Sequence, residues 1–511
     1  MISRKRSIAA KILILGLLAG CSQPGVRRGP AEVQSLSAWL TNFRNWVKSD
    51  FDSGNCGDSL RGFYRDLLQT FPAERFSSEI RGRADEAARA FFEARQELRD
   101  GMFRLHREGV LAESCVDQAR DVMRVLRYAE EFIAEHAVNP KPHNPKKPYP
   151  YLGGAAPYLQ KGIGSESFSV PGDLRSGDII LSRGGAFASA AIARMSKVPG
   201  QFSHGAFIYV DPASGRPWVL ESHIEIGSRV RTYEEYAKNT SVRAMVLRMR
   251  TAEDRELAGR AATIAYERLR TAALSPAKLV PYDFSMDLAD DREFFCTEIQ
   301  YYGFMKASEG KVQVPLVLGR IEPKNRDFVN RLGIQVSRSF LPSDMDVDPR
   351  FEVLAEWRDL AQMASVRRKD AVLDRFYGWA DDHGYVLQGN ASSWFKKSVI
   401  WRLRRWPLFS ELLDTKFPVN MPRSVLEVMS VLNDIGETLE DVVEKSDDAV
   451  LKGRGMRLTI AEMERVLDEF RLQDLARDEE YQRWSRKHSG STHPSVSPKP
   501  PRIHLLFRPA N

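Results

Sequence analysis

The spacing of apolar residues changes twice along this chain, and each change predicts a change of structure. In residues 21–137 and again in 352–486, apolar positions recur every three or four residues, as on the buried face of a helix. In residues 162–351 they instead form short runs separated by turns, as in strands. Closely spaced prolines in 138–161 predict an extended linker. The end, 487–511, is rich in Ser, Pro and Lys, and we expect a disordered tail there.

These patterns predict an α+β fold in which a small, mainly antiparallel sheet lies between two helical domains. Four amphipathic helices are expected before the linker, arranged as a bundle or as long hairpins. Apolar positions on their buried faces include Leu40, Leu67, Phe91 and Leu126. After the sheet, the helical spacing is expected to begin with Phe351, Leu354, Trp357 and Leu360.

Four strands are predicted in the central region from short apolar runs beside turns. They are Asp178–Leu181, Ala206–Val210, Trp218–Leu220 and Arg243–Leu247. Helical spacing follows from Leu257 to Leu269. A second helix is predicted to start at Cys296, with Ile299 and Tyr302 on its buried face.

The N-terminus has the pattern of a secretory signal. A basic start is followed by the apolar run 12–19, which is too short to span a bilayer as a helix. The string LLAGC resembles the bacterial lipobox and implies a signal peptide at 1–20, with acylation of Cys21 as a membrane anchor. Ser22 stands where that pattern reserves Asp for inner-membrane retention, so we expect the periplasmic face of the outer membrane. A plain signal peptide or a retained anchor is the alternative.

The charge of the chain does not point to nucleic acid. The formal net charge is +7, but removal of the first twenty residues, with four basic residues and no acid, lowers it to +3. This small excess predicts no nucleic-acid partner. The segment 394–409 mixes cations with Trp and Phe. It either lies on an anionic membrane face or packs on its own domain with the cations outward.

Export changes the interpretation of the other cysteines. Cys56 and Cys115 both lie in the first helical domain. In an oxidising envelope they are expected to form a disulfide, and two separate buried thiols are the alternative.

Cys296 and His204 are the predicted nucleophile and base. Cys296 follows two aromatic residues at the start of a predicted helix, where the positive end of the helix dipole favours the thiolate. His204 opens a buried strand in the string QFSHGAFIYV. A thiolate attacks carbonyl carbon, and an imidazole accepts the thiol proton and returns it to the leaving group.

Four strings, in this order, resemble the circularly permuted papain-like amidases of the YiiX/YaeF group, which are related to NlpC-type peptidases. LRSGDIILSR resembles the opening strand of that family, FSHGAFIYV its histidine strand, VLES the strand of its polar third residue, and PYDF with FFCTEIQYY its cysteine helix. The later FLPSDMDVDPRF resembles the family's C-terminal extension. The resemblance covers residues 168–351. It implies a permuted papain-like domain in 162–351 and a cysteine-dependent amidase.

The resemblance assigns the third residue of the triad to Glu221, which would orient the imidazole. His223, Glu225 and Asp283 are competing candidates nearby in the sequence. Backbone N–H groups near the cysteine are expected to hold the oxyanion. Tyr282 is a weaker candidate for a pocket wall or an additional donor.

A zinc site is an alternative use of Cys296, His204, His223 and a carboxylate. No paired metal-ligand spacing supports it, so no metal and no cofactor are predicted. The leading hypothesis is an envelope lipoprotein that cleaves amide bonds through a thioester acyl-enzyme. Its substrate would be a cell-wall peptide or a lipid amide or ester. A non-catalytic scaffold and a thiol-dependent acyltransferase are the alternative hypotheses.

Overall fold

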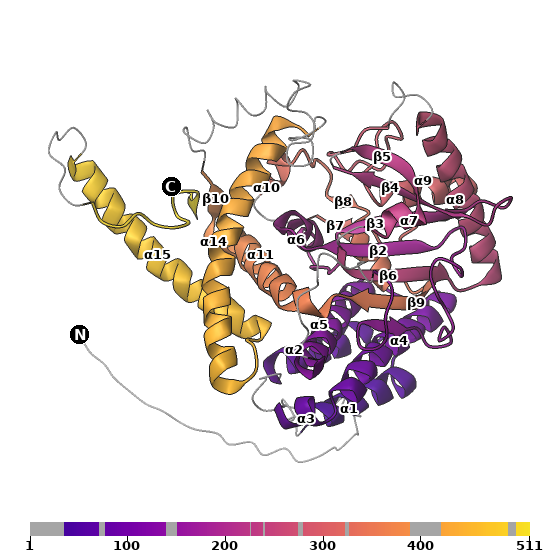
Figure 1. The fold of residues 1–511 in the computed structure, drawn as a ribbon, viewed down its shortest axis with the longest axis horizontal. Coiled ribbons are helices and arrows are strands. Elements are labelled where there is room, and N and C mark those ends of the chain that lie inside the picture. Colours follow the sequence, from indigo (N-terminus) through magenta and orange to yellow (C-terminus); the bar gives the residue numbers. More distant parts are fainter. Residues whose placement is uncertain are drawn as a thin grey trace, which may run out of the picture.

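The computed structural model of the protein describes residues 35–70, 77–138, 151–224, 226–238, 241–273, 280–321, 326–388, 421–488 and 497–510. The predicted signal peptide, Cys21, Glu225 and the segment 394–409 lie outside these residues. Within them, no helix is both long enough and apolar enough to cross a membrane. Helical regions at both ends of the described chain flank a central antiparallel sheet (Figure 1), which confirms the predicted α+β class.

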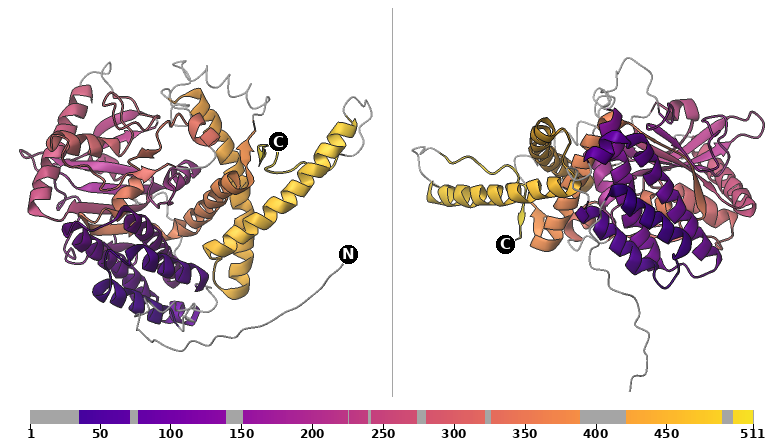
Figure 2. Two further views of the ribbon diagram at one scale, coloured as in Figure 1. Left: turned by 180° about the vertical axis from the view of Figure 1, so that it is seen from behind. Right: turned by 90° about the horizontal axis from the view of Figure 1, so that it is seen from below.

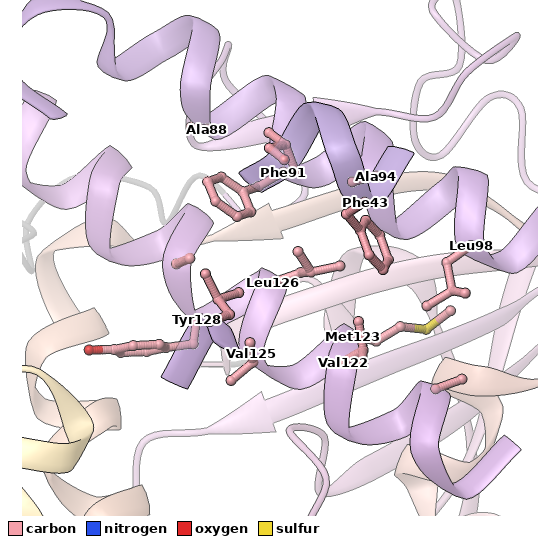
Figure 3. Close-up of a cluster of buried hydrophobic side chains, with 14 of the residues drawn as sticks. Phe43, Ala88, Phe91, Ala94, Leu98, Val122, Met123, Val125, Leu126 and Tyr128 are labelled. Carbon is pink, nitrogen blue, oxygen red and sulfur yellow. The ribbon is translucent and has the colours of Figure 1, made fainter. Parts of the chain in front are cut away.

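The N-terminal region is a helical bundle held by apolar side chains and one disulfide. Its helices are α1 (Leu36–Ser49), α2 (Cys56–Thr70), α3 (Ser77–Gly82), α4 (Ala84–Arg107) and α5 (Glu113–Val138). Figure 3 shows part of their core, where Phe91, Leu98 and Leu126 have no exposed surface. Cys56 at the start of α2 is bridged to Cys115 in α5, with the two Cα atoms 5.5 Å apart. The apolar residues that recur every three or four positions in the sequence are therefore the ones buried between these helices.

Seven strands form one sheet, and every neighbouring pair in it is antiparallel. The strands are β1 (Leu159–Lys161), β2 (Ile179–Gly184), β3 (His204–Val210), β4 (Pro217–His223), β5 (Gly227–Thr232), β6 (Ser241–Met249) and β9 (Phe351–Arg358). Their order across the sheet is β1-β9-β6-β2-β3-β4-β5. The four predicted strands are β6, β2, β3 and β4, which are neighbours. The sequence of β5, GSRVRT, contains only one apolar residue, so apolar runs do not reveal it.

Residues 351–358 form strand β9, where the sequence predicts the first turns of a C-terminal helix. That prediction is wrong because β9 is paired on both edges and covered on both faces. Apolar residues therefore occur on both of its faces, and the spacing of Phe351, Leu354 and Trp357 imitates that of a helix. The predicted start of a helical domain at 352 thus falls inside a strand. The predicted linker 138–161 likewise ends in a strand, β1.

The two faces of the sheet are covered differently. Helices α8 (Ala252–Ala273) and α9 (Glu298–Ala307) pack on one face around Phe207 and Leu247 (Figure 1). They pass close together because Gly303 has no side chain: a Cβ at this position would lie 2.6 Å from the carbonyl oxygen of Ala261. Residues 151–174 and α7 (Tyr233–Tyr236) cover the other face. The alternation of side chains along each strand supplies both cores.

The C-terminal region packs beside the sheet and extends away from it. Its elements include η2 (Pro342–Val347), η3 (Leu360–Gln362), α11 (Met363–His383), α14 (Arg423–Arg454) and α15 (Ile460–His488). Helices α11 and α14 contact α6 (Phe187–Arg194), which follows β2. In Figures 1 and 2, α15 projects from the body of the molecule. The contacts of α14 with α6 bring a segment far away in sequence next to the sheet domain.

Residues 497–510 are folded, although a disordered tail is predicted there. Strand β11 (Phe507–Pro509) pairs with β10 (Tyr385–Leu387). The ring of His504 bonds through Nδ1 to Asp474 of α15 (2.8 Å) and through Nε2 to the hydroxyl of Tyr385 (2.9 Å). The high content of Ser, Pro and Lys wrongly predicts disorder here. Two apolar residues of this segment, Ile503 and Phe507, are buried against the C-terminal helices and hold it in place.

A buried ion network joins the N-terminal bundle to the sheet. Arg127 of α5 bonds to Glu356 of β9 (2.8 Å) and to Asp346 of η2 (2.6 Å). Arg95 of α4 bonds to the other oxygen of Glu356 (2.7 Å). Arg127 also donates to the side chain of Gln201 (2.9 Å), three residues before β3 begins at His204. The bundle therefore holds the segment that leads into the histidine strand.

Candidate active site

Cys296 lies two residues before the start of α9, and its side chain is almost completely buried. The hydroxyl of Thr297 donates a hydrogen bond to the carbonyl oxygen of Phe340 (2.5 Å). The backbone N–H of Phe295 donates to the carboxyl group of Glu298 (3.1 Å). These bonds fix the backbone on both sides of Cys296, so the sulfur has a defined position at the helix start.

His204 is the first residue of β3, and the next residue controls how closely that strand approaches Cys296. A Cβ at Gly205 would lie 2.7 Å from Cγ2 of Thr297, a distance that carbon atoms do not adopt. Glycine is therefore required for β3 to pass beside the start of α9. The imidazole of His204 bonds to Glu221 and is close enough to Cys296 for the sulfur to raise the pKa of the ring.

Glu221, in β4, has no exposed surface and is contacted on both oxygens. Its Oε2 lies 3.2 Å from Nε2 of His204 and 2.9 Å from Nε2 of His223. Its Oε1 lies 2.5 Å from Nε of Arg231 and 3.2 Å from Nε of Arg229. Burial raises the pKa of Glu221, but its hydrogen bonds and charge interactions with the two histidines outweigh burial and hold that pKa well below the usual range. A carboxylate held at both oxygens can fix the orientation of an imidazole.

The protonation of His204 follows from these partners. Burial lowers the pKa of His204, but the hydrogen bonds with Cys296 and Glu221 and the charges of both groups outweigh burial and raise the pKa to about 10. The ring is therefore protonated at neutral pH. Since Nε2 faces Glu221, Nδ1 is the nitrogen left for the sulfur.

The competing candidates take other places. The carboxyl group of Asp283 is turned into its own loop, where it accepts hydrogen bonds from the backbone N–H and hydroxyl of Ser285 (both 2.7 Å). His223 contacts the same carboxylate as His204, with the two rings 4.6 Å apart. Burial and the charge of His204 lower the pKa of His223, although its bond with Glu221 opposes them. Tyr282 lines two cavities beside the cysteine.

The three groups His204, Glu221 and His223 place potential metal-ligand atoms within 4.8 Å of one another. However, both oxygens of Glu221 are already engaged, one by arginines and one by imidazoles. A cation beside Oε2 would displace the imidazole contacts and lie near two guanidinium groups. The donor set therefore fits the orientation of an imidazole better than metal binding.

The three side chains come in the order His204, Glu221, Cys296 along the chain. In space, His204 lies between the carboxylate and the sulfur. Residues 173–355 match the family model of the permuted papain-like amidases, YaeF/YiiX, C92 family. No curated protein matches the chain. The match coincides with the region of the resemblance seen in the sequence, so the central region is a YiiX-type permuted papain-like domain. The N-terminal bundle and the helices α11, α14 and α15 lie outside it.

Two cavities meet at Cys296 of the YiiX-type domain. One has a volume of about 700 Å³ and is mainly apolar. Its walls include Ile192, Phe295, Ile334, Val425, Leu426 and Met429. The other has a volume of about 650 Å³ and includes His204, His223 and several serines. Cys296, Tyr282 and Ile224 line both. A carbonyl group at the sulfur would thus have an apolar space on one side and a polar space on the other.

Sequence reasoning missed the contribution of residues outside the YiiX-type domain. Helix α14 supplies one wall of the apolar cavity, and Gln362 of η3 lines the polar one. No sequence signal distinguishes the cavity-lining residues of α14, because the apolar ones (Val425, Leu426 and Met429) continue its buried face and the polar ones (Ser430, Asn433 and Asp434) are typical of an exposed face. Arg229 and Arg231 were also missed. Their i, i+2 spacing places both on one face of a strand, and this signal is readable once β5 is known.

Proposed function

We propose that this protein is a cysteine hydrolase that cleaves an amide or ester bond through Cys296, His204 and Glu221. The observation that carries this proposal is that Cys296 and His204 line the same cavity, that His204 is hydrogen-bonded to the buried carboxylate of Glu221, and that two cavities meet at the sulfur. The match of residues 173–355 to a family of amidases supports the reaction type.

The first half of the reaction forms a thioester. The Cys296 thiolate attacks the carbonyl carbon of the substrate, and the protonated His204 gives its proton to the leaving amine or alcohol. Glu221 keeps the ring in position during this transfer. Backbone N–H groups at the start of α9 would stabilise the oxyanion, and the hydroxyl of Tyr282 is a second candidate donor.

The second half releases the acyl group. After the first step His204 is neutral, so it can accept a proton from water that attacks the thioester carbon. The acid product leaves, the sulfur is released as thiolate, and the thiolate–imidazolium pair is restored. Glu221 stabilises the imidazolium in both halves, since it remains ionised throughout.

The apolar cavity favours a lipid acyl group over a cell-wall peptide. Its walls are mainly Met, Ile, Leu, Val and Phe side chains, and a volume of about 700 Å³ is within the usual range of ligand sites. The lining also contains the polar residues Asp283, Ser430, Asn433 and Asp434. A peptide cross-bridge is polar along its length, however, and its groups would lose hydration against the apolar side chains that make up most of the walls. An acyl chain would instead gain from its transfer out of water.

We also propose that the protein acts in the bacterial envelope as a lipoprotein anchored through Cys21. The motivation is the string LLAGC after a basic, apolar leader. Cys21→Ala should then move the protein from the membrane fraction to the soluble envelope fraction. An unaltered membrane fraction for this variant, with no acyl mass on the native N-terminal peptide, would refute the anchor.

The enzymatic proposal is tested with nitrophenyl esters and N-acyl amides of increasing chain length, and with purified cell wall as the competing substrate. We expect kcat/KM to rise with chain length, no release of peptides from the wall, and a thioester adduct in the intact mass. Cys296→Ser should lower activity by orders of magnitude. Wall cleavage without lipid cleavage would overturn the substrate assignment. Full activity of Cys296→Ser would overturn the mechanism.

A further inference from the structure

The polar cavity beside Cys296 offers hydroxyl and amide groups, and the one charged ring in its described lining, the His204 imidazolium, is already paired with the carboxylate of Glu221. Among the described residues that line it there is no Lys, Arg, Asp or Glu. Its polar groups, apart from the histidines, Tyr282 and the thiol, belong to Ser182, Ser189, Ser203, Ser222, Ser241 and Gln362. A charged ligand group would lose its hydration there, and the described lining has no counter-charge that is not already engaged in the triad, so its burial is costly. The cavity is therefore suited to a neutral, hydrogen-bonding group.

Gly184, the last residue of β2, makes room for one of these polar groups, and Gly185 lies beside another. A Cβ at Gly184 would lie 2.6 Å from Oγ of Ser189, and a Cβ at Gly185 would lie 3.4 Å from Oε1 of Gln362. Both glycines also line the cavity. The serine hydroxyl thus occupies the place that a side chain at position 184 would need, and the glutamine oxygen lies beside the backbone of Gly185. Both side chains line the cavity.

The orientation of the Gln362 amide is determined by its neighbour. Its Nε2 donates a hydrogen bond to Oδ2 of Asp359 (2.7 Å). Because a carboxylate only accepts hydrogen bonds, the amino end of the amide must face Asp359, and the carbonyl oxygen is the end near Gly185. Asp359 is itself held, since its other oxygen accepts from the backbone N–H of Ala361 (3.1 Å). Gln362 therefore presents a fixed acceptor, and the hydroxyl of Ser189 can both donate and accept.

We propose that this cavity is the leaving-group subsite and that it takes a neutral group rich in hydroxyls, of the glycerol or sugar type, with Ser189 and Gln362 as specificity residues. This inference rests on the proposed acyl hydrolysis and adds the second half of the substrate. An acyl chain in the apolar cavity and a polyhydroxyl group in the polar cavity would place the joining carbonyl at Cys296. A phosphate would call for arginine or lysine, and an ammonium group for a carboxylate, which the described lining does not contain.

The test compares four dodecanoyl esters that differ only in the leaving group: glycerol, glycerol 3-phosphate, choline and nitrophenol. We expect kcat/KM for the glycerol ester to exceed that for each charged ester at least tenfold. A charged ester hydrolysed within threefold of the glycerol ester would overturn the proposed subsite. The nitrophenyl ester needs no recognition of a head group, so its hydrolysis reports the proposed function separately.

Binding to Cys296→Ala protein gives the same comparison without turnover. Titration calorimetry with monododecanoylglycerol and with dodecanoyl glycerol 3-phosphate should show at least tenfold tighter binding of the neutral lipid. If the nitrophenyl ester is not hydrolysed, the proposed function fails, and this binding preference still decides whether the cavity selects a neutral group. Equal affinities would overturn the subsite.

Two substitutions test the role of Gln362. Gln362→Met keeps the volume but removes the acceptor, and it should lower the ratio of kcat/KM for the glycerol ester to that for the nitrophenyl ester by three- to tenfold. Gln362→Glu adds a negative charge and should raise the relative activity toward the choline ester. The matched control, Gln388→Met, alters a glutamine that lines neither cavity and should keep the wild-type ratio. A ratio within twofold of wild type for Gln362→Met would remove Gln362 from the proposal.

Discussion

The ring Nε2 of His204 lies 3.2 Å from Oε2 of Glu221, a carboxylate with no exposed surface. Arg229 and Arg231 hold the other oxygen of this carboxylate, so the group that orients the imidazole is itself oriented from the next strand. Because Glu221 is fixed and charged, it favours the protonated form of His204.

The reactivity of Cys296 should depend on His204. Because His204 stays protonated up to about pH 10, it stabilises a neighbouring thiolate at neutral pH. Iodoacetamide should therefore alkylate Cys296 at pH 7 at least tenfold faster in the wild type than in His204→Ala. The rate is measured from the mass of the Cys296 peptide across pH 5–11. His383→Ala, at an exposed histidine, is the control. Equal rates for wild type and His204→Ala would show that the two side chains do not act as a pair.

Glu221→Gln should shift the alkaline limit of activity. Activity on an N-acyl amide requires the protonated ring, so kcat/KM should fall as the pH rises through about 10 in the wild type. The amide side chain keeps an acceptor for the ring but lacks the charge that raises the pKa of His204. The pH at which kcat/KM falls should therefore be lower in Glu221→Gln than in the wild type. The loss of activity should be smaller than in Cys296→Ser. Glu234→Gln, on an exposed acid, should keep the wild-type profile. An unchanged alkaline limb in Glu221→Gln would remove Glu221 from the triad.

Gly205→Ala should separate the histidine strand from the start of α9. The added Cβ would meet Cγ2 of Thr297 at 2.7 Å, so β3 must move away from Cys296. A displacement of about 1 Å can cost about 100-fold in rate, and we expect a loss of kcat of that order. Gly259→Ala is the matched control, since its Cβ would come no closer than 3.8 Å to a neighbouring atom. This variant should keep its activity and gain stability of up to about 1 kcal/mol from better helix propensity.

Arg127→Met should destabilise the whole chain. The substitution leaves Glu356 and Asp346 buried with one cationic partner fewer, and a broken buried ion pair typically costs about 3–5 kcal/mol. The free energy of unfolding is measured by urea titration. Arg61→Met removes an arginine from an exposed pair with Asp58 and should change stability by less than about 0.5 kcal/mol. Similar values for both variants would contradict the role assigned to the buried network.

The disulfide between Cys56 and Cys115 should stabilise the N-terminal bundle. With a sequence separation of 59 between the two cysteines, the chain-entropy relation gives a stabilisation of about 4 kcal/mol. The double variant Cys56→Ala/Cys115→Ala should therefore unfold at a lower urea concentration, and a reductant should lower the stability of the wild type but not of the variant. Mapping of non-reduced tryptic peptides from the exported protein checks the bond directly. Two freely alkylated thiols there would contradict it.

Local patterns in the sequence determine much of the fold of this protein. The helices α1, α2, α4 and α5 and the strands β2, β3, β4 and β6 follow from the spacing of apolar residues, because a helix and a strand each repeat their buried positions at a fixed interval. The short helix α3 was not predicted. The strings around His204, Glu221 and Cys296 are local as well, and the sequence therefore brings these residues to attention before any contact between them is known.

Only the tertiary structure decided which distant segments complete the sheet and the site. β9 is a strand because it lies between β6 and β1, and its own apolar spacing predicts a helix. The partners of Glu221 come from β5, and the walls of the two cavities come partly from Gln362 and α14. The physical reason is that a contact between segments far apart in sequence depends on how their surfaces pack and how their charges are buried, and neither property is encoded in the local spacing of residues.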